Sequence, residues 1–156
     1  MNTEITIREA VKSDIPVLLQ YEQEVVKVER PMDPTIRSSD VTYYNLDMLM
    51  ENPRATVMVA CDGDKIVATG YALEKPARHY LDHETYAYFG FMYTEPDYRG
   101  KGINGKIVSA LQDWSTKAGL TEIRLHVYND NDPAIRAYEK KGFKRHMIEM
   151  RLRTES

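Results

Sequence analysis

Residues 94–106 read Thr-Glu-Pro-Asp-Tyr-Arg-Gly-Lys-Gly-Ile-Asn-Gly-Lys, a loop sequence with glycine at Gly100, Gly102 and Gly105. An aromatic-rich run over 85–94, typical of a strand, precedes it, and apolar residues at helical spacing follow it as far as Gly119. A glycine-rich connection between a strand and a helix exposes backbone N–H groups beside the positive end of the helix dipole. The stretch therefore predicts an anion-binding loop.

The spacing of these glycines fits more than one kind of loop. It matches G-x-G-x-x-G, the dinucleotide-binding fingerprint, and also most of a P-loop. The P-loop interpretation fails at Ile107, because Ser or Thr is needed there to hold Mg²⁺. The dinucleotide interpretation is weakened because residues 95–99 separate the strand from the first glycine, and Asp130 matches the expected acidic position only loosely. A helix-start loop with incidental glycines is the plain alternative.

Working outward from the loop, hydrophobic periodicity and turn signals give the order β-α-α-β-β-β-α-β-α-β. This order predicts one mixed α/β domain over residues 1–156, with an α+β mixed sheet. The predicted strands are residues 5–8, Ala55–Cys61, Lys65–Leu73, Thr85–Thr94, Glu122–Tyr128 and Phe143–Leu152. The first predicted helix begins near Ser13 and ends before Pro31. The other predicted helices cover Asp40–Glu51, Gly102–Gly119 and Pro133–Lys141.

Composition narrows the function classes. The chain has 156 residues and a formal net charge of −3, which suits one domain. No apolar run approaches the roughly 20 residues of a membrane span, and residues 1–11 lack the apolar core of a secretory signal. A pI near 5.8 without a basic stripe argues against nucleic-acid binding. Cys61 is the single cysteine, so no intramolecular disulfide can form and we expect a cytoplasmic protein. Together these features predict no membrane and no nucleic-acid partner.

Two motifs carry a family resemblance. Residues 94–104 resemble the acyl-CoA-binding motif V-x-P-x-x-R-G-x-G-[IV]-[GA] of the GNAT superfamily of N-acetyltransferases. Residues 131–143, Asn-Asp-Pro-Ala-Ile-Arg-Ala-Tyr-Glu-Lys-Lys-Gly-Phe, resemble the second signature of that family, N-x-x-A-x-x-x-Y-E-K-x-G-F. Both stand in the family order, separated by one helix and one strand. The resemblance implies a single-domain GNAT-like fold and an N-acetyltransferase that takes acetyl-CoA as co-substrate.

The resemblance also implies where the cofactor binds. Backbone N–H groups of the loop would hold the CoA pyrophosphate, and residues 92–94 would lie along the pantetheine arm, where one N–H would polarise the thioester carbonyl. Asn104 and Thr94 depart from the family pattern. Asn131 has an alternative role of equal weight, in a turn with its neighbours. The cofactor-binding residues implied are Met92, Tyr93, Thr94, Arg99, Gly100, Lys101, Gly102, Ile103, Asn104, Gly105 and Asn131.

Tyr138 matches the family's general acid, which would protonate the leaving thiolate of CoA. Its position on one face of a predicted helix, taken alone, favours the alternative that Tyr138 is a buried ring of the core. The carboxylate that many family members carry on the strand before the loop is missing from residues 86–92. Glu84, His83 or Tyr88, acting through a water, are candidate bases. The missing carboxylate favours one alternative function, a non-catalytic acyl-CoA-binding sensor, and the glycine pattern leaves a second, a nicotinamide-dependent oxidoreductase.

The acceptor is a small-molecule or peptide amine that the sequence does not identify, and a homodimer is left open. The family needs no metal, and the pair His79 and His83 lies in a predicted loop. Residues 29–38 fall where the family shapes its acceptor pocket, although solvated charges are the default for this loop. Tyrosine is in excess, with 11 Tyr against 3 Phe. Packing is the expected role for all but Tyr88, Tyr93, Tyr98 and Tyr138.

Overall fold

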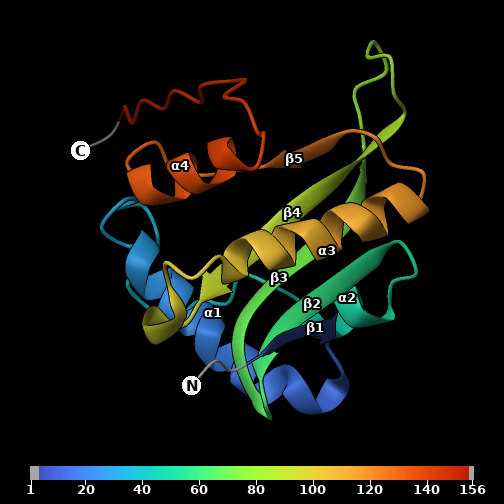
Figure 1. The fold of residues 1–156 in the computed structure, drawn as a ribbon. Helices are drawn as coiled ribbons and strands as arrows, with labels where there is room; N and C mark the ends of the chain where they lie inside the picture. The colour runs from blue at the N-terminus through green and yellow to red at the C-terminus, as the bar shows by residue number, and fades with distance from the viewer. Residues whose placement is uncertain (1–3, 155–156) are drawn as a thin grey trace.

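The computed structural model describes residues 4–154, which build one five-stranded sheet with helices on both faces (Figure 1). The strands lie in chain order, and β1 to β4 pair antiparallel while β5 runs parallel to β4. The predicted meander before the glycine loop is confirmed. The strands are β1 (Ile5–Glu9), β2 (Ala55–Asp62), β3 (Lys65–Pro76), β4 (Thr85–Thr94) and β5 (Ile123–Leu125).

Two apolar cores lie on opposite faces of the sheet. On one face, α1 (Ile15–Glu29) and α2 (Leu46–Glu51) pack residues such as Leu18 and Leu49 against the strands. On the other face, α3 (Ile103–Lys117) packs Ile107 and Leu111, both fully buried, and it crosses in front of β3 and β4 in Figure 1. The fourth helix, α4 (Asp132–Lys140), follows β5. Short 3-10 turns precede α1 and α3, at Lys12–Asp14 and Pro96–Tyr98.

A bulge interrupts β4 at Phe91. Tyr71 pairs with Gly90 and Thr69 pairs with Tyr93, so Gly70 alone faces two residues of β4. Phe91 takes up the extra residue with a φ of 54°, the only positive φ outside glycine among residues 4–154. Such a backbone is costly for a bulky residue and is found mainly where the fold requires it. The bulge shifts the alternation of side chains along β4. Ala87 and Phe89 therefore face the core beside α3, whereas Phe91 and Tyr93 face the core beside α1.

Beyond the bulge, β4 and β5 diverge. Their parallel pairing covers only Ala87–Phe89 on β4, opposite Ile123–Leu125 on β5. Among the described residues, the part of β4 from Gly90 to Thr94 therefore has no strand partner on the β5 side. Backbone N–H and C=O groups on such an edge are open to a ligand. This edge runs directly into the glycine loop.

Three predicted elements are shorter or missing. The final strand expected over Phe143–Leu152 does not form: residues 143–154 are irregular, and Ile148, Met150 and Leu152 are 87–89% exposed. Phe143 still packs against the core, and Arg151 is bound to Asp33 and Thr35 at 3.3 and 2.9 Å. Strand Glu122–Tyr128 is reduced to β5, and the helix expected over Asp40–Glu51 begins only at Leu46. No helix among residues 4–154 has both the length and the apolar character of a membrane span.

Candidate functional site

The N-terminus of α3 is built as an anion cradle. Gly100 and Gly102 adopt left-handed backbone angles, with φ of 77° and 79°, which turn the chain sharply into the helix. Gly102 is the N-cap and has no side chain to bond the first N–H groups of the helix. These donors point out of a fifteen-residue helix, at its positive end. The predicted loop is therefore present, with geometry that suits a phosphate.

The two cationic side chains of this loop, Arg99 and Lys101, each make one contact within the protein. Arg99 donates from Nε to the backbone oxygen of Thr94 at 2.9 Å, which closes the turn behind the loop. The Lys101 ammonium lies 5.3 Å from the centre of the Tyr98 ring, a cation–π distance. Asn104 and Gly105 follow in the first turn of α3, whereas the side chain of Ile103 is 3% exposed and belongs to the core. Ile103 can therefore serve a ligand only through its backbone.

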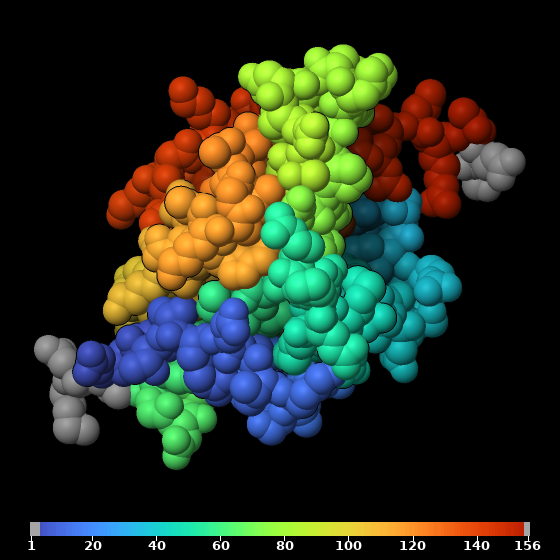
Figure 2. Space-filling view, turned by 90° about the vertical axis from the view of Figure 1, so that its right-hand side faces the viewer, coloured from blue at the N-terminus to red at the C-terminus, as the bar shows by residue number. Residues whose placement is uncertain are grey.

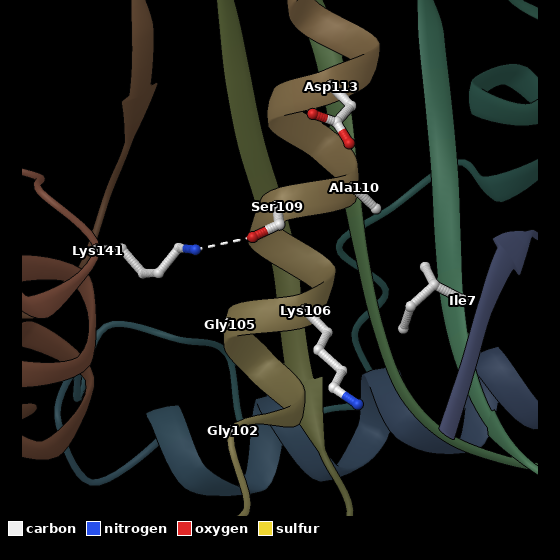
Figure 3. A pocket seen from close by; sticks show the side chains of 8 residues that line it. All are labelled: Ile7, Gly102, Gly105, Lys106, Ser109, Ala110, Asp113 and Lys141. Atoms are coloured by element: carbon white, nitrogen blue, oxygen red, sulfur yellow. Dashed lines mark hydrogen bonds between the residues drawn. The ribbon is translucent and has the colours of Figure 1, made fainter. Parts of the chain in front are cut away.

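A shallow hollow of about 440 Å³ lies beside the first turns of α3, next to Gly102, Gly105 and Lys106 (Figure 3). Lys141, at the end of α4, reaches across and donates to Ser109 Oγ on α3 at 2.8 Å. This contact joins the two helices whose sequences carry the two motifs. The Lys141 chain also lies over Gly105, where an added Cβ would meet its Cδ at 3.9 Å.

Residues 92–94 offer backbone rather than side chains to a ligand. The Tyr93 ring is 7% exposed and lies 4.7 Å from the ring of Tyr21, in the core beside α1. Met92 turns to the opposite face, toward α3. Thr94 pairs with Ala68 and accepts the Arg99 hydrogen bond. The open side of β4 at these positions is therefore its main chain, as the sequence resemblance implied.

Asn131 is the N-cap of α4. Its side-chain oxygen accepts from the backbone N–H of Ala134 at 3.3 Å. The sequence offered a turn with the preceding residues as the alternative role, and the Asn131 N–H does donate to the Tyr128 backbone oxygen at 3.0 Å; the helix cap was not predicted. The amide nitrogen of Asn131 remains the side-chain group that could donate to a ligand.

Tyr138 lies near the point where β4 and β5 separate. Its ring packs edge-on against Phe143 at 5.9 Å, and Phe143 in turn meets Phe89, the last paired residue of β4, at 6.4 Å. Burial raises the pKa of Tyr138 to about 12, and the neighbouring Tyr88 and Glu29 act in the same direction. The phenol is therefore held protonated at neutral pH, the state needed in a proton donor.

Glu29 ends α1 and begins the segment 29–38, which the resemblance placed at the acceptor pocket. Its carboxylate is half-buried, and burial raises its pKa above the usual range. The Glu29 charge also adds to the raised pKa of Tyr88 and Tyr138, after burial and a neighbouring tyrosine. Glu22 and Glu29 are seven residues apart, on one face of α1.

Tyrosines gather around this carboxylate. Glu29 raises the pKa of Tyr43, Tyr44 and Tyr128, after the larger effect of burial. The Tyr44 ring stacks on Phe91 at 4.5 Å, which places this group against the bulge of β4. Burial is the first cause of the raised pKa of Tyr43, Tyr44 and Tyr128, in line with the packing role expected for these three rings. The Glu29 charge raises the pKa of five tyrosines in all, Tyr43, Tyr44, Tyr88, Tyr128 and Tyr138.

The candidate bases before β4 lie at the wrong end of the strand. Glu84 is exposed and ends the β3–β4 connection, which projects from the body of the protein in Figures 1 and 2. Eight residues of strand separate it from Met92, about 26 Å at ~3.3 Å per residue. His83 is bound to Asp82 and Arg124, each at 2.8 Å. Of the three candidates, only Tyr88 lies near Tyr138.

Comparisons with known proteins agree with this geometry. Residues 22–143 match the model of the acetyltransferase (GNAT) family, so the chain belongs to that family of acyltransferase enzymes. It is 27% identical to a thialysine N-epsilon-acetyltransferase of Sus scrofa, over 88% of this chain and 83% of that protein. A mycothiol acetyltransferase of Corynebacterium aurimucosum is 43% identical over a segment that spans 30% of this chain and 16% of that protein.

A solved structure shows the same fold. A protein from Clostridium acetobutylicum described as a predicted acetyltransferase, crystallised with acetyl-CoA, superposes with a TM-score of 0.75 at 22% identity, over 96% of both chains. The antiparallel pairing of β1 to β4 also contradicts the nicotinamide-dependent alternative, because a dinucleotide fold is a doubly wound and mostly parallel sheet. The glycine loop opens the helix of a single β4–α3–β5 crossover instead.

Proposed function

We propose that the chain is an acetyl-CoA-dependent N-acetyltransferase whose acceptor is a primary amine of a small molecule or peptide. One observation carries this proposal: the open main-chain edge of β4 leads directly into the uncapped N-terminus of α3. An acyl-CoA has the matching shape, with an amide-rich arm joined to a pyrophosphate. A relative that acetylates the ε-amine of thialysine supports an amine as acceptor. The domain extends over residues 1–156 in this proposal, and its site of action is the cytoplasm.

The cofactor residues divide into three groups by what they offer. Backbone N–H groups from Gly100 to Gly105 bind the pyrophosphate, with charge added by Arg99 and Lys101. The β4 edge at residues 92–94 pairs with the amides of the pantetheine arm and supplies a donor to the thioester oxygen. Asn131 adds its amide N–H₂ from the start of α4. No metal ion enters this proposal.

Acetyl-CoA supplies an activated acyl carbon. A neutral amine held beside the β4 edge attacks it, so that a C–N bond forms and the C–S bond breaks. Tyr138 donates its hydroxyl proton to the departing sulfur and regains a proton from the newly acylated nitrogen. This exchange is favourable because a free thiol, with a pKa of about 8.5, binds a proton more tightly than the acylated ammonium does. The chain itself contributes position, one oxyanion donor and one proton.

The proposal is tested by following thiol release from acetyl-CoA with a panel of primary amines, together with thermal shifts. We expect stabilisation by CoA and acetyl-CoA, and turnover with at least one amine. Stabilisation by NAD instead of acetyl-CoA would contradict the proposal. Stabilisation by acetyl-CoA without turnover on any amine would favour the alternative of an acyl-CoA sensor on the same fold.

A further inference from the structure

A row of aromatic rings extends outward from the bulge of β4, on the sheet face that carries α1. Tyr44 stacks on Phe91 at 4.5 Å between ring centres, and its ring lies 5.8 Å from that of Tyr71. Tyr71 in turn lies 6.3 Å from Tyr88, a partly buried ring at the border of the core beside α1. These four residues form the aromatic row. Its inner end is at the bulge, where β4 and β5 diverge.

A lysine closes the outer end of the aromatic row. Leu73 on β3 pairs with Tyr88, and Lys75 follows two residues later, so its side chain leaves the sheet on the same face. The Lys75 ammonium lies 4.1 Å from the centre of the Tyr88 ring, a cation–π distance. The residue is partly buried. Lys75 therefore rests on the aromatic row instead of extending into water.

This ammonium is a spare positive charge. Among residues 4–154, no aspartate or glutamate forms an ion pair with Lys75. Glu74, the next residue in the chain, points to the opposite face of the sheet and is bound to Arg54. The neighbouring cation on the same face, Arg124, has a partner of its own, the Glu122 carboxylate at 3.5 Å. Lys75 can therefore receive an anion without giving up a protein partner.

The spacing suits a ligand that spans from the bulge to Lys75. Tyr88 lies three residues before Phe91, about 10 Å along β4 at ~3.3 Å per residue. Tyr44 and Tyr88 keep part of their surface exposed, so an aliphatic chain can lie against these two rings. A single ammonium without backbone N–H donors beside it matches a carboxylate better than a phosphate, which needs several donors.

We propose that Lys75 binds a carboxylate at the far end of the acceptor, so that the substrate class is an amino acid whose reacting amine and carboxylate are separated by an aliphatic chain. This inference rests on the proposed function. The ion pair holds one end of the acceptor, the aromatic row holds the chain, and the amine at the other end reaches the bulge of β4. Because the carboxylate is bound away from the amine, it does not keep that amine protonated.

The test compares straight-chain amino acids, each with its amine on the terminal carbon, with their own primary amides: aminobutanoate, aminohexanoate and aminooctanoate. The amide keeps the shape and the reacting amine but removes the charge. At the best length, we expect kcat/KM of the wild type to favour the acid about tenfold, the worth of one charged hydrogen bond. Lys75→Met keeps a chain on the Tyr88 ring and should abolish this preference by raising the KM of the acid, with the KM for acetyl-CoA unchanged. Lys75→Arg should keep the preference, as should the control Lys27→Met, at a side chain on α1 that is 76% exposed.

Binding is measured separately from turnover, so that the two proposals can fail independently. With CoA present, hexanoate should raise the melting temperature of the wild type and of Lys27→Met more than hexanamide does, and this difference should vanish in Lys75→Met.

Equal or poorer use of the acid at all three lengths by the wild type, or an unchanged preference in Lys75→Met, would overturn the role of Lys75 alone. Hexanoate binding that depends on Lys75, without acetylation of any amine, would retain this site and contradict the proposed enzyme. Without turnover and without a hexanoate shift in the wild type, both proposals would fail.

Discussion

The buried carboxylate of Glu22 accepts a 2.8 Å hydrogen bond from the backbone N–H of Tyr44, across 22 residues of chain. The adjacent N–H, of Tyr43, binds the same oxygen at 2.9 Å. This contact explains why the predicted helix over 40–51 starts late: the N–H groups at 43 and 44 are directed to α1, and Asn45 then caps α2 by accepting from Met48. It also sets Tyr44 against Phe91 at the bulge.

Replacing Glu22 should therefore destabilise the protein. Glu22→Ala leaves two buried N–H groups without an acceptor, and we expect the free energy of unfolding to fall by about 3 kcal/mol. Glu22→Gln keeps an acceptor oxygen and should lose less. Urea unfolding measures both, with Glu24→Ala on the exposed face as control. A loss as small as that of the control would show that the carboxylate does not hold residues 43–44.

Tyr138→Phe should lower kcat about a hundredfold, the usual worth of a general acid, and leave the KM for acetyl-CoA unchanged. The phenylalanine ring preserves the packing against Phe143 and removes only the hydroxyl. Steady-state thiol release gives both constants. Tyr80→Phe, at a ring that is 64% exposed, serves as the comparison. Full turnover in Tyr138→Phe would remove this hydroxyl from the reaction.

Two glycines of the loop should respond to alanine in opposite directions. Gly102 has a φ of 79° with open space around it. In Gly102→Ala the only cost is the strain of a left-handed backbone, which should lower the free energy of unfolding by about 1 kcal/mol. The same strain should raise the KM for acetyl-CoA. Gly105 lies in the first turn of α3 without a positive φ, and Gly105→Ala should gain about 0.5–1 kcal/mol. Equal stability changes in thermal unfolding would argue against the loop geometry.

The buried tyrosines should make the fold sensitive to alkali. Tyr71 is 9% exposed, and burial raises its pKa to about 12, with Tyr88 adding to the effect. The unfolded phenol ionises near 10, so between about pH 10 and 12 the unfolded state releases its proton first and stability falls with rising pH. Two pKa units amount to at most about 3 kcal/mol. Urea unfolding across this range should show a shallower decline in Tyr71→Phe than in Tyr80→Phe.

Local sequence was sufficient for the elements near the glycine loop. Strand alternation over 85–94 gave β4 with its bounds, and helical spacing after Gly102 gave α3. Glycine angles and helix starts depend on a few neighbouring residues, which is why the loop could be predicted. The two motifs then supported the family, which the comparisons confirm.

Elements that depend on distant partners were predicted less well. The expected last strand shows the alternation of a strand, yet residues 143–154 form no ladder, because a strand needs a partner edge as well as a pattern. The bulge at Phe91 follows from the register between β3 and β4, and no local signal marks it. The Glu22 bonds to residues 43 and 44 likewise join segments more than 20 residues apart.

The sequence by itself determined the order of the elements from β1 to α4, the glycine loop and the family, since each rests on short-range geometry or on a contiguous motif. Only the tertiary structure decided which side chains share the site. The buried Glu22 contacts hold residues 43 and 44, Tyr44 stacks on Phe91 at the bulge of β4, and Tyr138 packs against Phe143. The physical reason is that such contacts join residues far apart in the chain, where neither periodicity nor spacing relates one to the other.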